Sequence, residues 1–234
     1  MKNQQIKRVG LLRFLSVLFA LGIIAGSIGF GAKIYLDRSL DHMAEEGILR
    51  NEALADHPLR QALDEQEIKE YVREFFPVIF RQDEAGLEAL IRKSLDLMIR
   101  NSPEDFRNYA MRDEAKYRDL LDRSTAKVLE NEEFSGSLQV LAEKSRQKLG
   151  FRRYLLEAAL HHREVTIGGA ALAAVSLLLW LVLGGISAGV VRTGFLPALL
   201  ISAVCAGAIL FTAGDMTPYY SRDIDFAAII LQYI

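Results

Sequence analysis

Two long apolar stretches follow one another near the end of the chain. No charged residue occurs from Thr166 to Val191 or from Thr193 to Gly214, and Arg192 alone separates the two stretches. A helix needs roughly 20 residues to cross the hydrocarbon core of a bilayer. Because each stretch reaches that length, we predict a hairpin of two transmembrane helices.

A third apolar stretch lies near the N-terminus. Residues 14–32 carry no charge and follow a basic start that contains Lys2, Lys7 and Arg8. A signal peptide also has a basic start, and Ala25-Gly26-Ser27 would suit its cleavage site, but its apolar core is usually only about 7 to 15 residues long. The longer stretch here predicts an uncleaved membrane helix.

Small residues recur at four-residue spacing within these stretches. The pairs are Gly22 and Gly26, Gly169 and Ala173, Ala170 and Ala174, Gly185 and Gly189, and Ala203 and Gly207. Such spacing lets helix backbones approach closely in lipid, where little hydrophobic force acts between helices. We expect the two hairpin helices to pack on each other, with the first helix as a further partner, although glycine is also common in membrane helices without a packing role.

The residues between the first and second apolar stretches are rich in charge and follow a helical period. From Leu59 to Gln82 the apolar side chains recur every three to five positions, which predicts a helix that kinks or ends at Pro77. Asp83 is suited to cap the next helix through its carboxylate. This half of the region therefore contributes two predicted helices.

The second half of the charged region predicts two more helices. Residues 102–105, a serine, a proline and two acids, have the composition of a capped helix start, and the helical period continues to about Glu132. We predict a turn at residues 131–136 and a last helix from Leu138 toward His162. Strand-like alternation of useful length is absent from this sequence, and a compact bundle of about four helices is expected.

Together the patterns predict an all-α integral membrane protein with three transmembrane helices and a helical-bundle soluble domain between the first and second. The predicted parts are 1–36 (N-terminal basic flank and first transmembrane helix), 37–164 (charged helical bundle), 165–191 and 193–214 (second and third transmembrane helices) and 215–234 (a short tail). The nine apolar-rich residues that close the tail are too few to span a bilayer. They predict an interfacial helix or a strand that docks on a partner.

Basic residues around the apolar stretches give conflicting indications of orientation. Four of them precede or open the first stretch and favour a cytoplasmic N-terminus, whereas Arg152, Arg153 and Arg163 precede the second stretch and favour the opposite. The first helix usually dominates, and large domains are translocated despite their charge. We therefore predict a bacterial inner (plasma) membrane protein with its N-terminus in the cytoplasm and residues 37–164 outside.

Composition argues against nucleic-acid binding and against several classes of enzyme. The net charge of −2 gives no basic footprint for nucleic acid. The single cysteine, Cys205, lies in an apolar stretch, so the sequence shows neither a disulfide pair nor a cysteine-based zinc motif. Ser187 lies in a Gly-Ile-Ser-Ala-Gly segment without the strand-to-helix context of a nucleophile. We predict no enzyme activity, no cofactor and no catalytic or metal-binding residues.

One group of side chains still has the composition of a ligand site. Glu157 and His161 are four residues apart, His162 and Glu164 follow them, and Asp215 ends the last apolar stretch on the same side of the membrane. Carboxylate and imidazole groups together suit a divalent metal or a proton relay. An ordinary exposed pair of Glu157 with His161 explains the same pattern, and we favour it.

A second group is basic and lies ahead of the second apolar stretch. Its members are Arg146, Lys148, Arg152, Arg153 and Arg163. Near a bilayer such residues attract anionic lipid. The expected partner is lipid or a docking protein in preference to nucleic acid.

The hypothesis that these observations favour is a non-catalytic accessory or scaffold subunit of a larger membrane protein complex, which docks through its helical domain and its spans. Its expected partners are the lipid bilayer and other membrane protein subunits, with a homo-oligomer as a further possible assembly. The alternative, from another class, is a receptor-like sensor whose helical bundle binds a ligand. A homo-oligomeric channel or transporter is less favoured, because the spans lack charged residues to line a polar pore.

Overall fold

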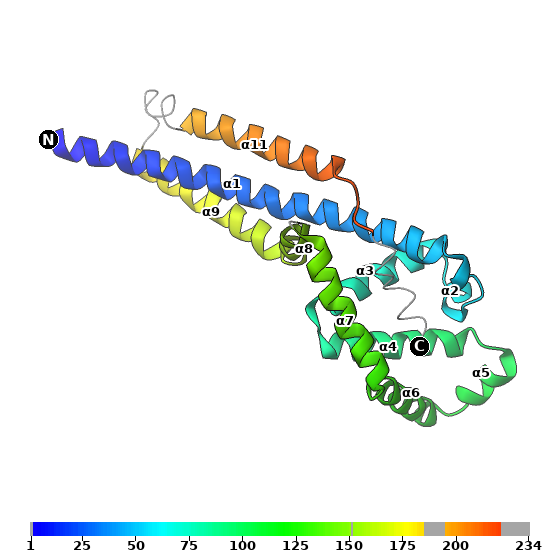
Figure 1. Cartoon of the computed structure of the whole chain (residues 1–234). Coiled ribbons are helices and arrows are strands. Elements are labelled where there is room, and N and C mark those ends of the chain that lie inside the picture. The colour runs from blue at the N-terminus through cyan, green and yellow to red at the C-terminus, as the bar shows by residue number, and fades with distance from the viewer. Residues whose placement is uncertain (1, 151, 185–194, 221–234) are drawn as a thin grey trace. The chain divides into compact units, whose positions relative to one another are not determined.

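The computed structural model describes residues 2–150, 152–184 and 195–220 of the chain (Figure 1). All elements in these ranges are helical, which confirms the predicted all-α class. Three of the described helices are long and apolar enough to cross a membrane, as predicted, and they cover Val9–Leu49, His162–Leu183 and Leu196–Asp215.

The chain divides into two compact units, which are described separately below. The first, called the apolar unit, comprises Met1–Leu36 and Arg152–Thr217, and the second, called the charged unit, comprises Asp37–Phe151 and Pro218–Ile234. The elements are α1 (Lys2–Ala44), η1 (Glu45–Leu49), η2 (Glu52–Leu54), α2 (Pro58–Ala62), α3 (Glu65–Arg81), α4 (Glu84–Arg100), α5 (Glu104–Ala110), α6 (Glu114–Leu129), α7 (Glu132–Leu149), α8 (Arg152–Leu160), α9 (His162–Gly184) and α11 (Leu196–Asp215).

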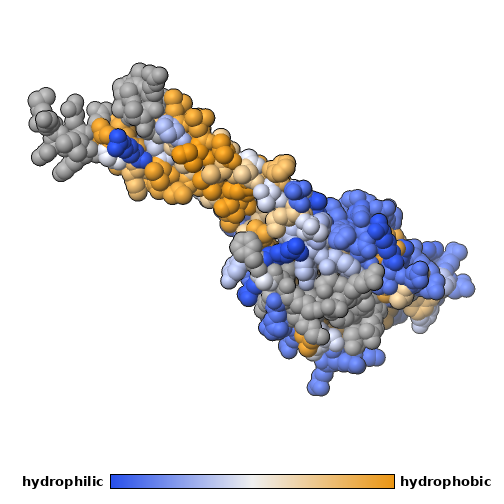
Figure 2. All heavy atoms as spheres, turned by 45° about the horizontal axis from the view of Figure 1, so that its top comes forward, coloured by the Kyte–Doolittle hydropathy of each residue, from blue (hydrophilic) through white to orange (hydrophobic). Residues whose placement is uncertain are grey.

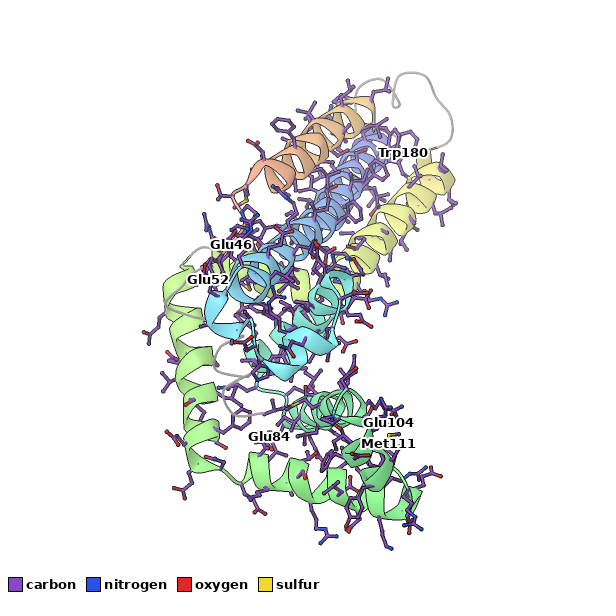
Figure 3. All side chains as sticks on the ribbon, turned by 90° about the vertical axis from the view of Figure 1, so that its right-hand side faces the viewer. Glu46, Glu52, Glu84, Glu104, Met111 and Trp180 are labelled. Carbon is purple, nitrogen blue, oxygen red and sulfur yellow. The ribbon has the colours of Figure 1, made fainter. Side chains whose placement is uncertain are left out.

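The apolar unit is built around α1, which lies between α9 and α11 (Figure 1 and Figure 3). Its outward-facing side chains are largely apolar, and they include the strongly exposed Val182, Val204 and Phe211. Figure 2 shows this apolar surface in orange along the long helices. Exposed side chains of this kind would cost free energy in water but not in lipid, where the surroundings are equally apolar.

The charged unit has its core between α3, α4, α6 and α7. One face of α3 is buried, including Ile68, Phe75 and Ile79, because apolar residues recur there with the helical period. Helix α4 packs against both α3 and α6. The amphipathic pattern thus places each helix with its apolar stripe toward the centre of this unit.

Local helix-start signals explain several element boundaries. Asp83 caps α4 by accepting a hydrogen bond from the Gly86 backbone N–H at 3.1 Å, as predicted. The predicted helix from Leu59 to Gln82 is wrong in one respect, because it is divided at Asp64. This residue forms a capping box with Glu67 at the start of α3. Helix α3 continues past Pro77 to its end at Arg81.

The helix start predicted at residues 102–105 is confirmed, because α5 begins at Glu104 with two acids in its first turn, but the predicted serine cap is wrong. The Ser102 hydroxyl donates to the carbonyl of Ile99 at 2.6 Å, so it satisfies the end of α4 and does not cap α5. The helix that was expected to continue to about Glu132 is interrupted after Ala110, and Asp113 caps α6 through its side chain. A serine beside a helix boundary can serve either helix, because its hydroxyl both donates and accepts.

The predicted turn at residues 131–136 is in fact the start of a helix. Asn131 accepts hydrogen bonds from the backbone N–H groups of Glu133 and Phe134, at 2.9 and 3.2 Å, and α7 begins at Glu132. The predicted last helix of the region is divided as well, because α7 ends at Leu149. Gly150 has a φ of +51°, which favours glycine.

Residues 218–220 belong to the charged unit and contact the end of α1. The Tyr219 backbone N–H donates to the Ser39 hydroxyl oxygen at 3.1 Å, and the Tyr220 ring meets the His42 ring edge to face. The predicted docking segment at the end of the tail lies outside the described residues.

Candidate functional site

The closest helix contact in the apolar unit joins α1 to α9. A Cβ atom placed on Gly22 would lie 2.6 Å from the backbone nitrogen of Ala173 and 2.7 Å from the carbonyl oxygen of Gly169. A Cβ atom placed on Gly169 would lie 2.5 Å from the backbone nitrogen of Gly26. Real Cβ atoms do not approach other atoms this closely. Only glycine therefore fits at these positions, and the two backbones are in direct contact.

Further along α1 the contacts involve both neighbouring helices. A Cβ atom on Gly29 would meet the Thr166 hydroxyl oxygen of α9 at 2.7 Å. A Cβ atom on Gly31 would meet side chains of Ile209 and Ala213 of α11, at 3.2 and 3.3 Å. The described contacts thus place α1 as the shared partner of the two hairpin helices, whereas the sequence led us to expect the hairpin helices to pack chiefly on each other.

Aromatic packing fixes the opposite part of the same unit. Trp180 of α9 is 3% exposed and clusters with Leu12 and Leu15 of α1. The Phe195 ring, just before α11, lies 5.2 Å from the Trp180 ring and 5.0 Å from the Phe19 ring. These offset rings join all three long helices through apolar contact.

Three serine hydroxyls in the long helices donate to carbonyl groups of their own helix. Ser16 donates to the Leu12 carbonyl at 2.9 Å, and Ser27 donates to the Ile23 carbonyl at 2.8 Å. In α11, Ser202 donates to the Leu199 carbonyl at 2.9 Å. These three groups make no hydrogen bond between helices, whereas the Thr166 hydroxyl of α9 is buried without a hydrogen-bond partner among the described residues.

The structure does not gather the predicted ligand residues into one site. Glu157 pairs with Arg153 at 2.8 Å and not with His161. His161 lies 3.9 Å from Glu164, and the His162 Nδ1 atom lies 2.8 Å from the Ala159 carbonyl oxygen. Among the described residues, Asp215 included, no three histidine, cysteine or acidic side chains are placed to hold a metal ion together.

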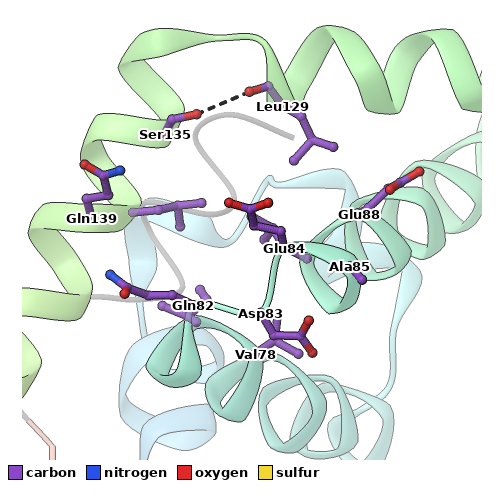
Figure 4. A pocket seen from close by; sticks show the side chains of 12 residues that line it. Val78, Gln82, Asp83, Glu84, Ala85, Glu88, Leu129, Ser135 and Gln139 are labelled. Atoms are coloured by element: carbon purple, nitrogen blue, oxygen red, sulfur yellow. Dashed lines mark hydrogen bonds between the residues drawn. The ribbon is translucent and has the colours of Figure 1, made fainter.

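An open cavity of about 770 Å³ lies in the charged unit (Figure 4). It is lined by the end of α3, the start of α4, the end of α6 and the first half of α7, with side chains that include Ile79, Leu87, Leu138, Glu84 and Glu88. Gln82 lines it too, with a left-handed φ of 57° that ends α3. The lining therefore combines apolar side chains with acidic ones.

Two buried or partly buried polar contacts hold α4 in place in the core of the charged unit, which also contains the cavity. The Tyr71 and Ser94 hydroxyls share a hydrogen bond of 2.7 Å, and burial raises the pKa of Tyr71 to about 12. The Tyr117 hydroxyl donates to Asp96, whose second oxygen accepts from Arg100 at 2.8 Å. Partial burial raises the pKa of Asp96, but the hydrogen bonds from Arg100 and Tyr117 outweigh it and hold that pKa below its usual range.

The pKa of Tyr117, the other partner in that contact, shifts in the opposite direction. Burial and, to a smaller extent, the hydrogen bond to the Asp96 carboxylate raise the pKa of Tyr117 to about 12. Tyr71, Ser94, Asp96 and Tyr117 are therefore locked in fixed protonation states near neutral pH and serve to position helices. None of them lines the cavity, so they provide no reactive group there.

Sequence reasoning missed the cavity altogether. Its walls come from two pairs of consecutive helices, α3 with α4 and α6 with α7, which are separated in the chain by α5, and none of its residues forms a motif. The only local signal was the Asp83 cap, which marks the boundary between α3 and α4 that opens onto the cavity. Neither a protein-family model, nor a curated protein, nor a solved structure matches this chain.

Proposed function

We propose that this chain is a non-catalytic subunit of a larger membrane protein complex, anchored by three transmembrane helices, that acts as an accessory or scaffold. The observation that supports this most is the glycine-mediated packing of α1 against α9 and α11, combined with apolar side chains on the outer faces of the same helices. Close backbone packing is a principal source of helix association in lipid. Outer faces of this kind match a lipid or protein environment.

The dimensions of the apolar unit support a membrane-spanning role. With a rise of 1.5 Å per residue, the segment of α1 from Leu12 to Lys33 is about 31 Å long. The hydrocarbon core of a bilayer is about 30 Å thick. The aromatic cluster around Trp180 lies at one end of this length and the Gly29–Thr166 contact near the other.

We further propose a bacterial inner membrane location with a cytoplasmic N-terminus. Residues 1–36 contain five basic and no acidic side chains, whereas residues 37–164 contain 21 basic and 27 acidic ones. The basic segment favours the cytoplasm under the positive-inside rule, which depends mainly on lysine and arginine. Residues 37–164 would then lie outside the cytoplasm as a soluble domain.

Purification of the intact protein from its native membrane in mild detergent tests this function. A scaffold subunit is expected to bring down partners in fixed stoichiometry, and these are identified by mass spectrometry. Substituting Val204 or Phe211 on the outer face of α11 by alanine should weaken that capture, whereas Gly168→Ala on α9 should not. A protein that emerges alone would rule the accessory role out.

The cavity of the charged unit favours a second candidate function, that of a ligand sensor. Its apolar side chains and the carboxylates of Glu84 and Glu88 suit an amine that carries an apolar group. Phenethylamine is a simple probe of this kind. A sensor predicts that phenethylamine raises the melting temperature of the full chain and that Glu84→Gln with Glu88→Gln removes the rise. Equal rises in the native and substituted proteins would exclude the cavity as the binding site.

A further inference from the structure

Helix contacts define where the apolar part of the unit ends. The Gly29–Thr166 and Gly31–Ala213 contacts place these four residues near one level of the three-helix unit. Beyond that level the next charged residues are Lys33 on α1, Glu164 and Arg163 at the start of α9, and Asp215 at the end of α11. Under the proposed function this level is one boundary between lipid tails and headgroups.

Helix α8 comes immediately before this boundary and belongs to the apolar unit. It ends at Leu160, and α9 begins two residues later at His162. In Figure 1 α8 is seen nearly along its own axis, whereas α9 lies across the view, so the chain turns sharply between them. A short helix that turns in this way at the end of a span lies along the membrane surface.

The two faces of α8 differ in the way that an interfacial helix requires. Leu156 and Ala159 are fully buried. Tyr154 is on the opposite face and is 67% exposed, whereas Arg153, three residues before Leu156, is at the edge between the two faces. Tyrosine is enriched at headgroup level, where its ring contacts apolar chains and its hydroxyl meets water.

Two arginines near the two ends of α8 have no acidic partner in the described chain. The charge of Arg153 is balanced locally, because Arg153 pairs with Glu157. Arg152 at the start of α8 and Arg163 at the start of α9 form no ion pair with any described residue. Their guanidinium groups are suited to the phosphates of lipid headgroups, which arginine can bind through two hydrogen bonds at once.

We propose that α8 lies in the membrane interface and that Arg152 and Arg163 bind the headgroups of anionic phospholipids. This inference rests on the proposed membrane anchoring and names the partner of one of its surfaces. Each arginine near an anionic surface is expected to change the preference for anionic over neutral lipid about fivefold.

Tryptophan quenching by brominated lipids tests the inference on the full chain. Trp180 is the only tryptophan, so Trp180→Phe provides a background into which Tyr154→Trp introduces a reporter on α8 and Phe211→Trp one on the span. The thermal stability of the background variant is checked first. Each protein is reconstituted in vesicles of phosphatidylcholine and phosphatidylglycerol, in which only one of the two lipids carries bromine.

The expected result is quenching of the α8 reporter that is stronger when phosphatidylglycerol carries the bromine. Arg152→Gln with Arg163→Gln should bring the ratio of the two quenching efficiencies close to one. The matched control, Arg118→Gln with Arg123→Gln on α6, removes two exposed arginines that already pair with acids in their own helix and should leave the ratio unchanged.

Four other results would overturn the inference. A quenched Phe211→Trp reporter with an unquenched α8 reporter would place α8 away from the bilayer and leave the proposed anchoring intact. Lack of quenching at both reporters would remove the anchoring itself. Equal quenching of the α8 reporter by the two lipids would show that these arginines do not select anionic lipid. The same conclusion would follow if the Arg152 and Arg163 variant lost a co-purifying protein without a change in the quenching ratio.

Discussion

The contact between α1 and α9 makes a sharp prediction for a single added methyl group. Gly169→Ala puts a Cβ atom 2.5 Å from the Gly26 nitrogen and 2.6 Å from the Gly22 carbonyl oxygen. Ordinary van der Waals contact begins at 3.4 Å, so the added carbon is about 0.9 Å too close. Because the obstructing atoms are backbone and not the ends of side chains, the helices must move apart.

The energetic cost follows from that displacement. A gap of about 0.5 to 1 Å forfeits a quarter to a half of the attraction between the atoms that separate. Overpacking of this kind costs about 1 to 3 kcal/mol. Gly168, the neighbouring residue, has open space around its Cβ position, and Gly168→Ala should change the free energy of unfolding by about 0.5 kcal/mol at most.

The assay is unfolding by increasing amounts of a denaturing detergent in mixed micelles, followed by the fluorescence of Trp180. This side chain is buried against Leu12, Leu15 and Phe195 and reports the separation of the three helices. Both substitutions make the same change of residue type in the same helix, so the difference between them isolates the contact. Equal unfolding midpoints for Gly168→Ala and Gly169→Ala would refute the close packing.

Three predictions concern the charged unit of the full chain. Tyr117→Phe removes the hydroxyl that donates to Asp96 and should lower the free energy of unfolding, measured by denaturant titration, by about 1 to 2 kcal/mol. The control Tyr109→Phe changes an 80% exposed residue and should have no measurable effect. Burial raises the pKa of Tyr71 to about 12, from about 10 in an unfolded chain. The stability that the neutral phenol contributes is therefore fully present below about pH 10 and is lost as the pH rises through about 12. An ultraviolet absorbance titration should therefore show a late ionisation, to which Tyr71 and Tyr117 both contribute, and Tyr71→Phe should reduce its amplitude. Asn131→Ala deletes the cap of α7 and should cost about 1 kcal/mol in thermal melts.

The apolar helices could be predicted because a long uncharged stretch identifies a candidate span without reference to its neighbours. Helix caps were predicted only where one local interaction dominates. Asp83 is acceptor-only when ionised and caps α4, whereas the Ser102 hydroxyl can donate backwards as readily as it accepts, and it serves α4 in place of α5. Asn131 was assigned to a turn because asparagine favours both turns and helix starts.

The pairing of glycines could not be predicted for a different reason. The sequence shows small residues at the same spacing on three helices but not the faces they present. In the structure Gly22 and Gly169 meet, whereas Gly207 of α11 has open space around its Cβ position. The cavity is equally invisible to local patterns, because its walls are assembled from four helices that come together only in the folded unit.

The Gly22–Gly169 contact has a consequence for the order in which the protein is made. The two positions are separated by roughly 150 residues of chain. At a synthesis rate of about 5 to 20 residues per second, α1 waits roughly 7 to 30 s before its partner α9 leaves the ribosome. During that interval, on the proposed topology, its glycine face lies in the bilayer without the helix that later covers it. The biogenesis of this protein therefore requires either a lone α1 that tolerates this interval or an insertion factor that shields its glycine face until α9 arrives.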